Sequence, residues 1–233
     1  MGSNTKHILI VDDEPKIVEV VKSYLENSGY LVYGAYTGKQ ALEVFDEINP
    51  SLIVLDLMLP DTTGEEVCRI LRMKSKVPII MLTAKIEEED ILKGLGIGAD
   101  DYVTKPFSPR QLVARVEALL RRTGDNFASQ PKVLSFNDED LIIDNEKHDV
   151  KKNGISVNLT PNEFKILSTM VKYPKKAFTR EELIEMVIGN DFDGYDRVID
   201  THMKNLRQKI ESDAKKPQYI LTVHGVGYRF GGE

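Results

Sequence analysis

Acidic, hydroxyl and basic side chains follow four of the five short apolar runs in the first half of the chain. Asp12 and Asp13 come directly after the first run, and Asp56 comes directly after the third. Thr83 follows the fourth run, and Lys105 comes just after the fifth. Clustered carboxylates repel one another unless a cation neutralises them, and oxygen ligands of this kind suit Mg²⁺ (or Mn²⁺) rather than zinc. Beside a bound metal, one carboxylate could attack phosphorus and form an aspartyl phosphate.

The positions of these residues predict a division of roles. Asp56 is the best candidate nucleophile because it is central and single, whereas Asp12 and Asp13 are better placed as metal ligands. Lys105 would neutralise one phosphoryl oxygen and Thr83 would donate a hydrogen bond to another. Taken one at a time, these residues are ordinary helix caps, turn residues and solvated lysines. Only their joint placement favours a phosphoryl-transfer site.

The elements that must position these side chains form an α/β pattern. The apolar runs are residues 7–11, 31–35, 52–55 and 77–82, with a fifth around 102–103. Segments of helical period separate them, which predicts a parallel sheet covered on both faces. Five such units fit residues 1–122, the size of a flavodoxin-like domain. In a strand order of 2-1-3-4-5, strands one and three flank the crevice where ligands bind, and both carry acids at their carboxyl ends.

The same segments resemble the receiver-domain signature of two-component response regulators. They are His7–Pro15, Leu52–Pro60, Thr83-Ala84 and Gly98–Phe107. The resemblance implies that Asp56 is the phosphoacceptor, that Asp12 and Asp13 bind the metal, and that the backbone carbonyl of Met58 is a further ligand. It also implies a sensor histidine kinase as the phosphodonor.

Three further features follow from that resemblance. The Lys105-Pro106 peptide bond is expected to be cis. Thr83 and Tyr102 are expected to form a switch pair, in which Thr83 moves towards the phosphoryl group and the ring of Tyr102 turns inward. The receiver is expected to dimerise on phosphorylation through the surface of its fourth helix, fifth strand and fifth helix, with the interface residues Ile91, Asp101, Gln111 and Arg115.

The remainder of the chain has a different organisation. Residues 123–131 gather turn formers and predict a linker between domains at 1–122 and 132–233. Short antiparallel strands are expected near residues 133–136, 141–144, 149–151 and 156–159. Thr160 with Glu163 and Thr179 with Glu182 predict two capping boxes. A third helix is expected from about residue 196 to 212, followed by a hairpin at 219–223 and 228–230.

That third helix has an amphipathic pattern suited to DNA. Ile199, Met203, Leu206 and Ile210 recur at helical spacing and should face the core. The opposite side should present Arg197, Thr201, Lys204, Asn205 and Gln208, with Arg207 at its edge. Lys and Arg suit phosphates or guanine, and amides suit adenine. Residues 197–229 hold seven Lys and Arg against three acids, although the whole chain has a net charge of −6.

Together with three flanking motifs, this helix resembles the α+β winged-helix output domain of the OmpR/PhoB family. The motifs are Leu159–Phe164, Thr179–Leu183 and Thr222–Phe230. The resemblance implies a recognition helix in the major groove of double-stranded DNA, a wing at residues 219–230 in the minor groove or on the backbone, and a loop at 188–195 facing RNA polymerase. A receiver dimer would then read two tandem half-sites.

The expected DNA contacts are Arg197, Thr201, His202, Lys204, Asn205, Arg207, His224 and Arg229. Two of them depart from the family pattern, because His224 and Asn205 stand where relatives often carry Arg. His202 is next to core positions and is interpreted either as a helix-packing residue or as a phosphate contact.

Composition limits the other functions. The 233 residues contain 41% hydrophobic residues and no run long enough to span a membrane, and the single Cys68 suits packing in a reducing cytoplasm. A soluble cytoplasmic regulator is therefore expected, without an enzymatic role. A phosphatase would need a general acid two residues after its nucleophile, where this chain has Met58. A regulator that works without phosphate would have no need of the complete set of acidic, Thr and Lys residues.

Overall fold

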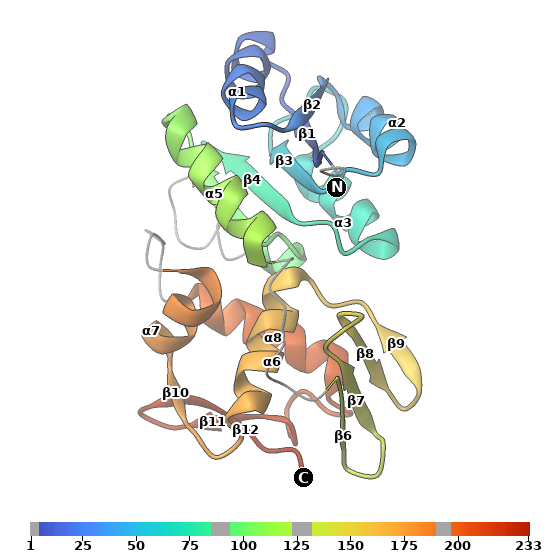
Figure 1. Ribbon diagram of the computed structural model, residues 1–233, viewed down its shortest axis with the longest axis vertical. Helices are drawn as coiled ribbons and strands as arrows, with labels where there is room; N and C mark the ends of the chain where they lie inside the picture. The colour runs from blue at the N-terminus through green and yellow to red at the C-terminus, as the bar shows by residue number, and fades with distance from the viewer. Residues whose placement is uncertain (1–4, 85–93, 123–131, 190–196) are drawn as a thin grey trace. The chain divides into compact units, whose positions relative to one another are not determined.

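The computed structural model describes residues 5–84, 94–122, 132–189 and 197–233 (Figure 1). Contacts between residues divide the chain into two compact units, Met1–Arg121 and Arg122–Glu233. Residues 123–131, interpreted above as the linker, lie outside the described residues. In the described residues, no helix is both long and apolar enough to cross a membrane.

The first unit is built on one parallel sheet. Its strands are β1 (His7–Val11), β2 (Leu31–Ala35), β3 (Leu52–Asp56), β4 (Ile79–Thr83) and β5 (Asp101–Thr104). They are hydrogen-bonded in the order β2-β1-β3-β4-β5, which confirms the predicted order. Every residue of β3 and β4 is buried, because the central strands of such a sheet are covered on both faces.

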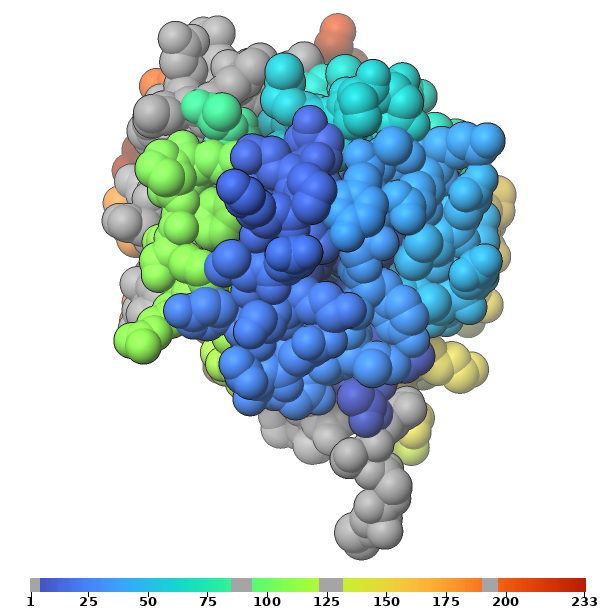
Figure 2. Space-filling view, turned by 90° about the horizontal axis from the view of Figure 1, so that it is seen from above, coloured from blue at the N-terminus to red at the C-terminus, as the bar shows by residue number. Residues whose placement is uncertain are grey.

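Helices cover both faces of this sheet. On one face, α1 (Pro15–Asn27) and α5 (Pro109–Arg122) pack their apolar sides, including Val21 and Val116, against strand residues such as Ile10. On the other face lie α2 (Gly38–Ile48) and α3 (Gly64–Lys74) (Figure 1). Figure 2 shows α5 in green on one side of the blue N-terminal segments and α2 in lighter blue on the other.

The described residues of the second unit form two antiparallel sheets, three α-helices and a π-helical turn. A four-stranded sheet contains β6 (Val133–Phe136), β7 (Leu141–Asp144), β8 (Asp149–Lys152) and β9 (Ile155–Val157). The helices are α6 (Pro161–Lys172), α7 (Arg180–Leu183), which continues into the π-helical turn η1 (Ile184–Ile188), and α8 (Val198–Ile210). The hairpin of β11 (Ile220–Val223) and β12 (Gly227–Phe230) ends the unit.

Two local predictions are confirmed in this unit and one element was not predicted. The capping boxes of Thr160 with Glu163 and of Thr179 with Glu182 are both formed. The unpredicted element is β10 (Phe178–Thr179), which pairs with β12 and makes the hairpin part of a three-stranded sheet. Two residues carry too little pattern to indicate a strand.

Candidate functional site

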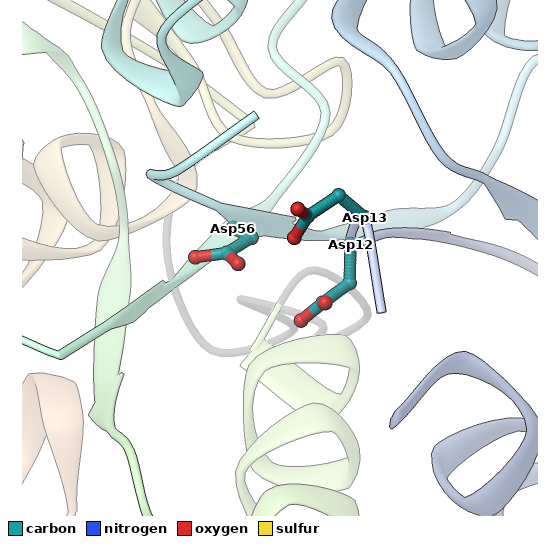
Figure 3. A group of neighbouring side chains, drawn as sticks. All are labelled: Asp12, Asp13 and Asp56. Atoms are coloured by element: carbon teal, nitrogen blue, oxygen red, sulfur yellow. The ribbon is translucent and has the colours of Figure 1, made fainter. Parts of the chain in front are cut away.

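Three carboxylates converge at the carboxyl end of the parallel sheet. Asp12 and Asp13 follow β1, and Asp56 is the last residue of β3, the strand that pairs with β1. One oxygen of each lies within 4.8 Å of an oxygen of the other two (Figure 3). Asp12 and Asp56 are buried, whereas Asp13 is exposed. Adjacent parallel strands that end at the same edge therefore bring these acids together, as their positions in the sequence predict.

Lys105 lies against the two buried carboxylates. Its Nζ donates to Oδ2 of Asp12 at 2.8 Å and to Oδ2 of Asp56 at 2.7 Å. The residue follows β5, and its own backbone N–H donates to the carbonyl of Thr83 at 2.7 Å. The Lys105-Pro106 peptide bond is cis, as the resemblance implied. One ammonium thus neutralises carboxylates from two different strands.

Burial and charge act in opposite directions on this pair. Burial raises the pKa of Asp56 above its usual value, and it outweighs the lowering effect of Lys105 and of the Met58 N–H. Burial alone would lower the pKa of Lys105, but its hydrogen bonds to Asp12 and Asp56 outweigh burial and raise that pKa. Lys105 is therefore held as a cation, while the charged form of Asp56 is disfavoured by its poor access to water.

The other expected members of this site lie on β4, on β5 and in the loop after β3. Thr83 is buried at the end of β4, beside β3 in the sheet. Tyr102 is half-buried in β5 and pairs in register with Met81 of β4. The backbone N–H of Met58 donates to Oδ1 of Asp56 at 3.3 Å, and the side chain of Met58 is exposed. The loop after β3 consequently starts by folding back on the Asp56 carboxylate.

Two residues that shape this loop were not singled out in the sequence. A Cβ at Gly64 would lie 2.1 Å from the backbone oxygen of Asp56, so only glycine fits where α3 begins. Asp61 accepts hydrogen bonds from the N–H groups of Gly38 at 2.8 Å and Lys39 at 2.9 Å, and thereby caps α2. The glycine at the start of α3 and the acid after Pro60 were the only signals, and neither identified its partner.

The donor set suits a hard divalent cation. Carboxylates from the two neighbouring strands supply oxygen ligands on one side, and the exposed Asp13 leaves an approach from solvent. Mg²⁺ prefers a few carboxylates with water in its remaining positions. The acidic pocket therefore fits the predicted metal, with Lys105 compensating part of its negative charge.

A second group of candidate residues lies on α8 and the β11–β12 hairpin. Arg197, Lys204, His224 and Arg229 are exposed, and Thr201 is half-buried. These side chains are accessible on the helix and hairpin that were expected to contact DNA.

Two of the residues expected to contact DNA are buried in this structure. Asn205 is 6% exposed and His202 is 1% exposed. The helical pattern predicted one buried stripe, but α8 is in contact with both α6 and α7, so a wider part of its circumference is covered. Burial, with a smaller effect of Lys209, lowers the pKa of His202 to about 4. Of the two interpretations of His202, helix packing is the one that its burial supports.

Arg207 is engaged within the unit. Its guanidinium donates to the carbonyl of Ile220 at 2.6 and 2.9 Å and to Oγ1 of Thr222 at 2.8 Å. It therefore attaches α8 to β11.

The residues expected at a dimer interface are partly described. Arg115 donates to the carboxylate of Asp101 at 3.1 and 3.2 Å within the same chain, and Gln111 is exposed on α5. Ile91 lies outside the described residues, as does most of the loop expected to face RNA polymerase.

Comparisons with known proteins find a family match for each half of the chain. Residues 8–117 match the family described as response regulator receiver domain, and residues 154–230 match the family described as transcriptional regulatory protein, C terminal. The chain is 44% identical over 231 residues to the DNA-binding response regulator MtrA of Mycolicibacterium smegmatis, with 99% of each chain covered. It is 44% identical over 226 residues to MtrA of Mycobacterium leprae, with 97% of this chain and 98% of that protein covered.

Two solved structures are similar to this chain over nearly its whole length. The response regulator DrrB of Thermotoga maritima, described as an OmpR/PhoB homologue, is 38% identical with a TM-score of 0.52, and the comparison covers 98% of this chain and 100% of DrrB. A mutant of RitR is 28% identical with a TM-score of 0.79, over 97% of this chain and 98% of that one.

Proposed function

The chain belongs to the OmpR/PhoB family of response regulators, and on this basis we propose that a phosphoryl group on Asp56 controls DNA binding by the second unit. The observation that carries the proposal is the contact of Lys105 with both Asp12 and Asp56 inside the acidic pocket. A phosphoryl group attached to one of these carboxylates requires a nearby cation to neutralise its negative charge. The ammonium of Lys105 already lies beside both carboxylates and can supply that charge.

The nucleophile in this proposal is a carboxylate oxygen of Asp56. It attacks the phosphorus of a phosphohistidine on a sensor kinase, the P–N bond breaks, and the imidazole leaves. Lys105 then neutralises a phosphoryl oxygen, and the hydroxyl of Thr83 donates a hydrogen bond to another. Because the charged form of Asp56 is disfavoured in its buried position, neutralisation by neighbouring cations also favours the reactive carboxylate.

Asp12, Asp13, Asp56 and the Met58 carbonyl would hold Mg²⁺ (or Mn²⁺). When bound, the metal supplies positive charge that offsets the charge of the phosphoryl group. The three carboxylates then serve to orient that charge towards the carboxyl end of β3.

The sensor kinase would dock beside the acidic pocket. A largely apolar hollow of about 560 Å³ lies between α1 and the segment after β5, and its lining includes Ile17, Val20, Phe107 and Lys105. Val20 is 46% exposed and adds apolar surface to this hollow, and contiguous apolar surface of this kind is typical of sites that bind a partner. A partner helix with an apolar side could cover this hollow and present its phosphohistidine to Asp56.

Phosphorylation would be transmitted by a switch at Thr83 and Tyr102. The added negative charge attracts Thr83, and the ring of Tyr102 turns towards the space that Thr83 leaves. The surface that includes Asp101, Gln111 and Arg115 would then pair two receivers. Two linked second units would bind tandem half-sites with greater avidity than one.

In the second unit, α8 would enter the major groove and the β11–β12 hairpin would reach the neighbouring backbone or minor groove. The exposed basic residues Arg197, Lys204 and Arg229 would contact phosphates or base edges, with His224 at the tip of the wing. The DNA-bound second unit would also contact RNA polymerase at promoters.

The test of phosphoryl acceptance uses the full chain with acetyl phosphate and Mg²⁺. Mass spectrometry of the intact protein should find one added phosphoryl group, and borohydride reduction should locate it at Asp56. Asp56→Asn should remain unmodified, whereas the exposed control Asp46→Asn should be modified like the wild-type chain. Modification of Asp56→Asn to the wild-type extent would refute the assignment.

A further inference from the structure

Asp200 is a carboxylate in the first turn of α8, the helix proposed to enter DNA. A negative charge beside phosphates weakens binding, because DNA affinity comes largely from cations that replace counterions. The side chain is 35% exposed, so solvent screens it only in part. Either Asp200 only stabilises the N-terminal end of α8, or it has another role whose benefit exceeds the cost of a negative charge near DNA.

The contacts of Asp200 join three elements of the second unit. Its Oδ1 accepts a hydrogen bond from Nε of Arg180, the first residue of α7, at 2.8 Å. The same oxygen accepts a hydrogen bond from the hydroxyl of Tyr228, in β12, at 2.7 Å. Hydrogen bonds to a charged acceptor are among the stronger ones in proteins. One oxygen atom therefore connects the proposed recognition helix to α7 and to the wing.

The ring of Tyr228 is held by cations as well. The guanidinium carbon of Arg180 lies 5.7 Å from the ring centroid, and that of Arg207 lies 5.6 Å from it. Arg207 also donates to Ile220 and Thr222 of β11, the partner strand of β12. Burial, followed by Asp200, raises the pKa of Tyr228 to about 12, so its hydroxyl stays a donor. Tyr228 of the hairpin therefore contacts α8 in two ways. Its hydroxyl donates to Asp200, and its ring lies beside the guanidinium of Arg207.

We propose that Asp200 is a positioning residue that fixes the recognition helix relative to the wing, so that both can contact one duplex at the same time. This inference rests on the proposed DNA binding by the second unit. Spacing along a duplex is set by the DNA, so a helix and a hairpin that move independently lose the advantage of simultaneous contact. Asp200 itself need not touch DNA.

Two substitutions at one position separate positioning from charge. Asp200→Ala and Asp200→Asn remove the same negative charge, but only the amide keeps an oxygen that can accept from Arg180 and Tyr228. If charge alone matters, both variants bind DNA equally and more tightly than the wild-type chain. If Asp200 positions the helix, Asp200→Ala weakens specific binding at least tenfold, whereas Asp200→Asn stays within about threefold of wild type.

The experiment uses the full chain with beryllofluoride and two duplexes. One duplex is enriched from a randomised pool by the wild-type chain, and the other is its scrambled sequence. Asp200→Ala should lose affinity for the enriched duplex and keep its affinity for the scrambled one. Asp213→Ala, which removes an exposed acid in a turn after α8, is the charge control and should not lose specific affinity.

Tyr228→Phe supplies an independent variant, because it removes only the hydroxyl that donates a hydrogen bond to Asp200 and changes no charge. It should shift specific affinity in the same direction as Asp200→Ala. Equal or tighter specific binding by Asp200→Ala, or full specificity in Tyr228→Phe, would overturn the inference. A wild-type chain that enriches no sequence would instead refute the proposed function, before any variant is made.

Discussion

Nζ of Lys105 lies 2.7 Å from Oδ2 of Asp56, although 49 positions separate the two residues in the chain. The contact exists because β3 and β5 both end at the edge of the sheet where β1 places Asp12. The lysine side chain is 18% exposed, so the interaction is sheltered from solvent. In the unphosphorylated chain, the ammonium of Lys105 neutralises two buried carboxylates. In the proposed function, it would also contact the phosphoryl group.

Lys105→Met keeps the length of the side chain and removes its charge. Without metal, the buried Asp12 and Asp56 then lose their cation, and the free energy of unfolding of the first unit should fall by about 3 kcal/mol. Mg²⁺ should restore part of that loss because it supplies charge to the same oxygens. Urea unfolding with and without Mg²⁺ measures both effects. Lys74→Met breaks the exposed pair with Asp46 and should cost less than about 1 kcal/mol.

Asp13→Asn should change the two properties of the pocket differently. Asp13 is exposed, whereas Lys105 is paired with Asp12 and Asp56, so the metal-free stability should stay within about 0.5 kcal/mol of wild type. The affinity for Mg²⁺, measured by titration calorimetry, should fall at least tenfold. An unchanged Mg²⁺ affinity would remove Asp13 from the metal site.

His202 gives the second unit a predictable acid sensitivity. Its pKa is about 4 in the folded chain and 6.5 as its ordinary value, so the unfolded state binds the proton more readily between these two values. Stability should therefore fall as pH decreases through this window, by about 2 kcal/mol between pH 7 and pH 5. His202→Leu should lack this part of the pH dependence in urea unfolding. An identical pH dependence in both chains would show that the pKa of His202 is not lowered in the folded chain.

Lys204 and Asn205 are neighbours on α8 but should respond differently to salt. Lys204 is exposed and proposed to contact a phosphate, so Lys204→Ala should reduce the slope of log affinity against log salt by about 0.9. Asn205 is buried, so Asn205→Ala should leave the slope unchanged. Fluorescence anisotropy with a labelled duplex at several salt concentrations provides the comparison. A reduced slope for Asn205→Ala would mean that the helix rearranges on DNA.

Much of the acidic pocket could be predicted because its members sit at strand ends. The alternation of apolar runs and helical periods indicates a parallel sheet, and a parallel sheet brings the carboxyl ends of its strands to one edge. Asp12, Asp56 and Lys105 needed no further information to be placed together. The cap that Asp61 forms on α2 could not be predicted in this way, since it depends on the path of a loop rather than on a period.

The limits on α8 have a different physical origin. Helical period gives the direction of each side chain, but it does not give how much of the circumference the neighbouring elements cover. Asn205 was therefore placed with Lys204 on the exposed side, although packing by α6 and α7 buries it. The hydrogen bonds of Asp200 could not be predicted from the sequence either, because its partners Arg180 and Tyr228 are 20 and 28 positions away.

The central claim is that a phosphoryl group on Asp56 controls DNA binding, and one affinity comparison tests it most directly. The dissociation constant for the enriched duplex is measured at fixed salt for the wild-type chain and for Asp56→Asn, each with and without beryllofluoride and Mg²⁺. The wild-type affinity should increase at least tenfold with beryllofluoride, while that of Asp56→Asn should not change. Equal wild-type affinities in the two conditions, or an equal increase in Asp56→Asn, would contradict the claim.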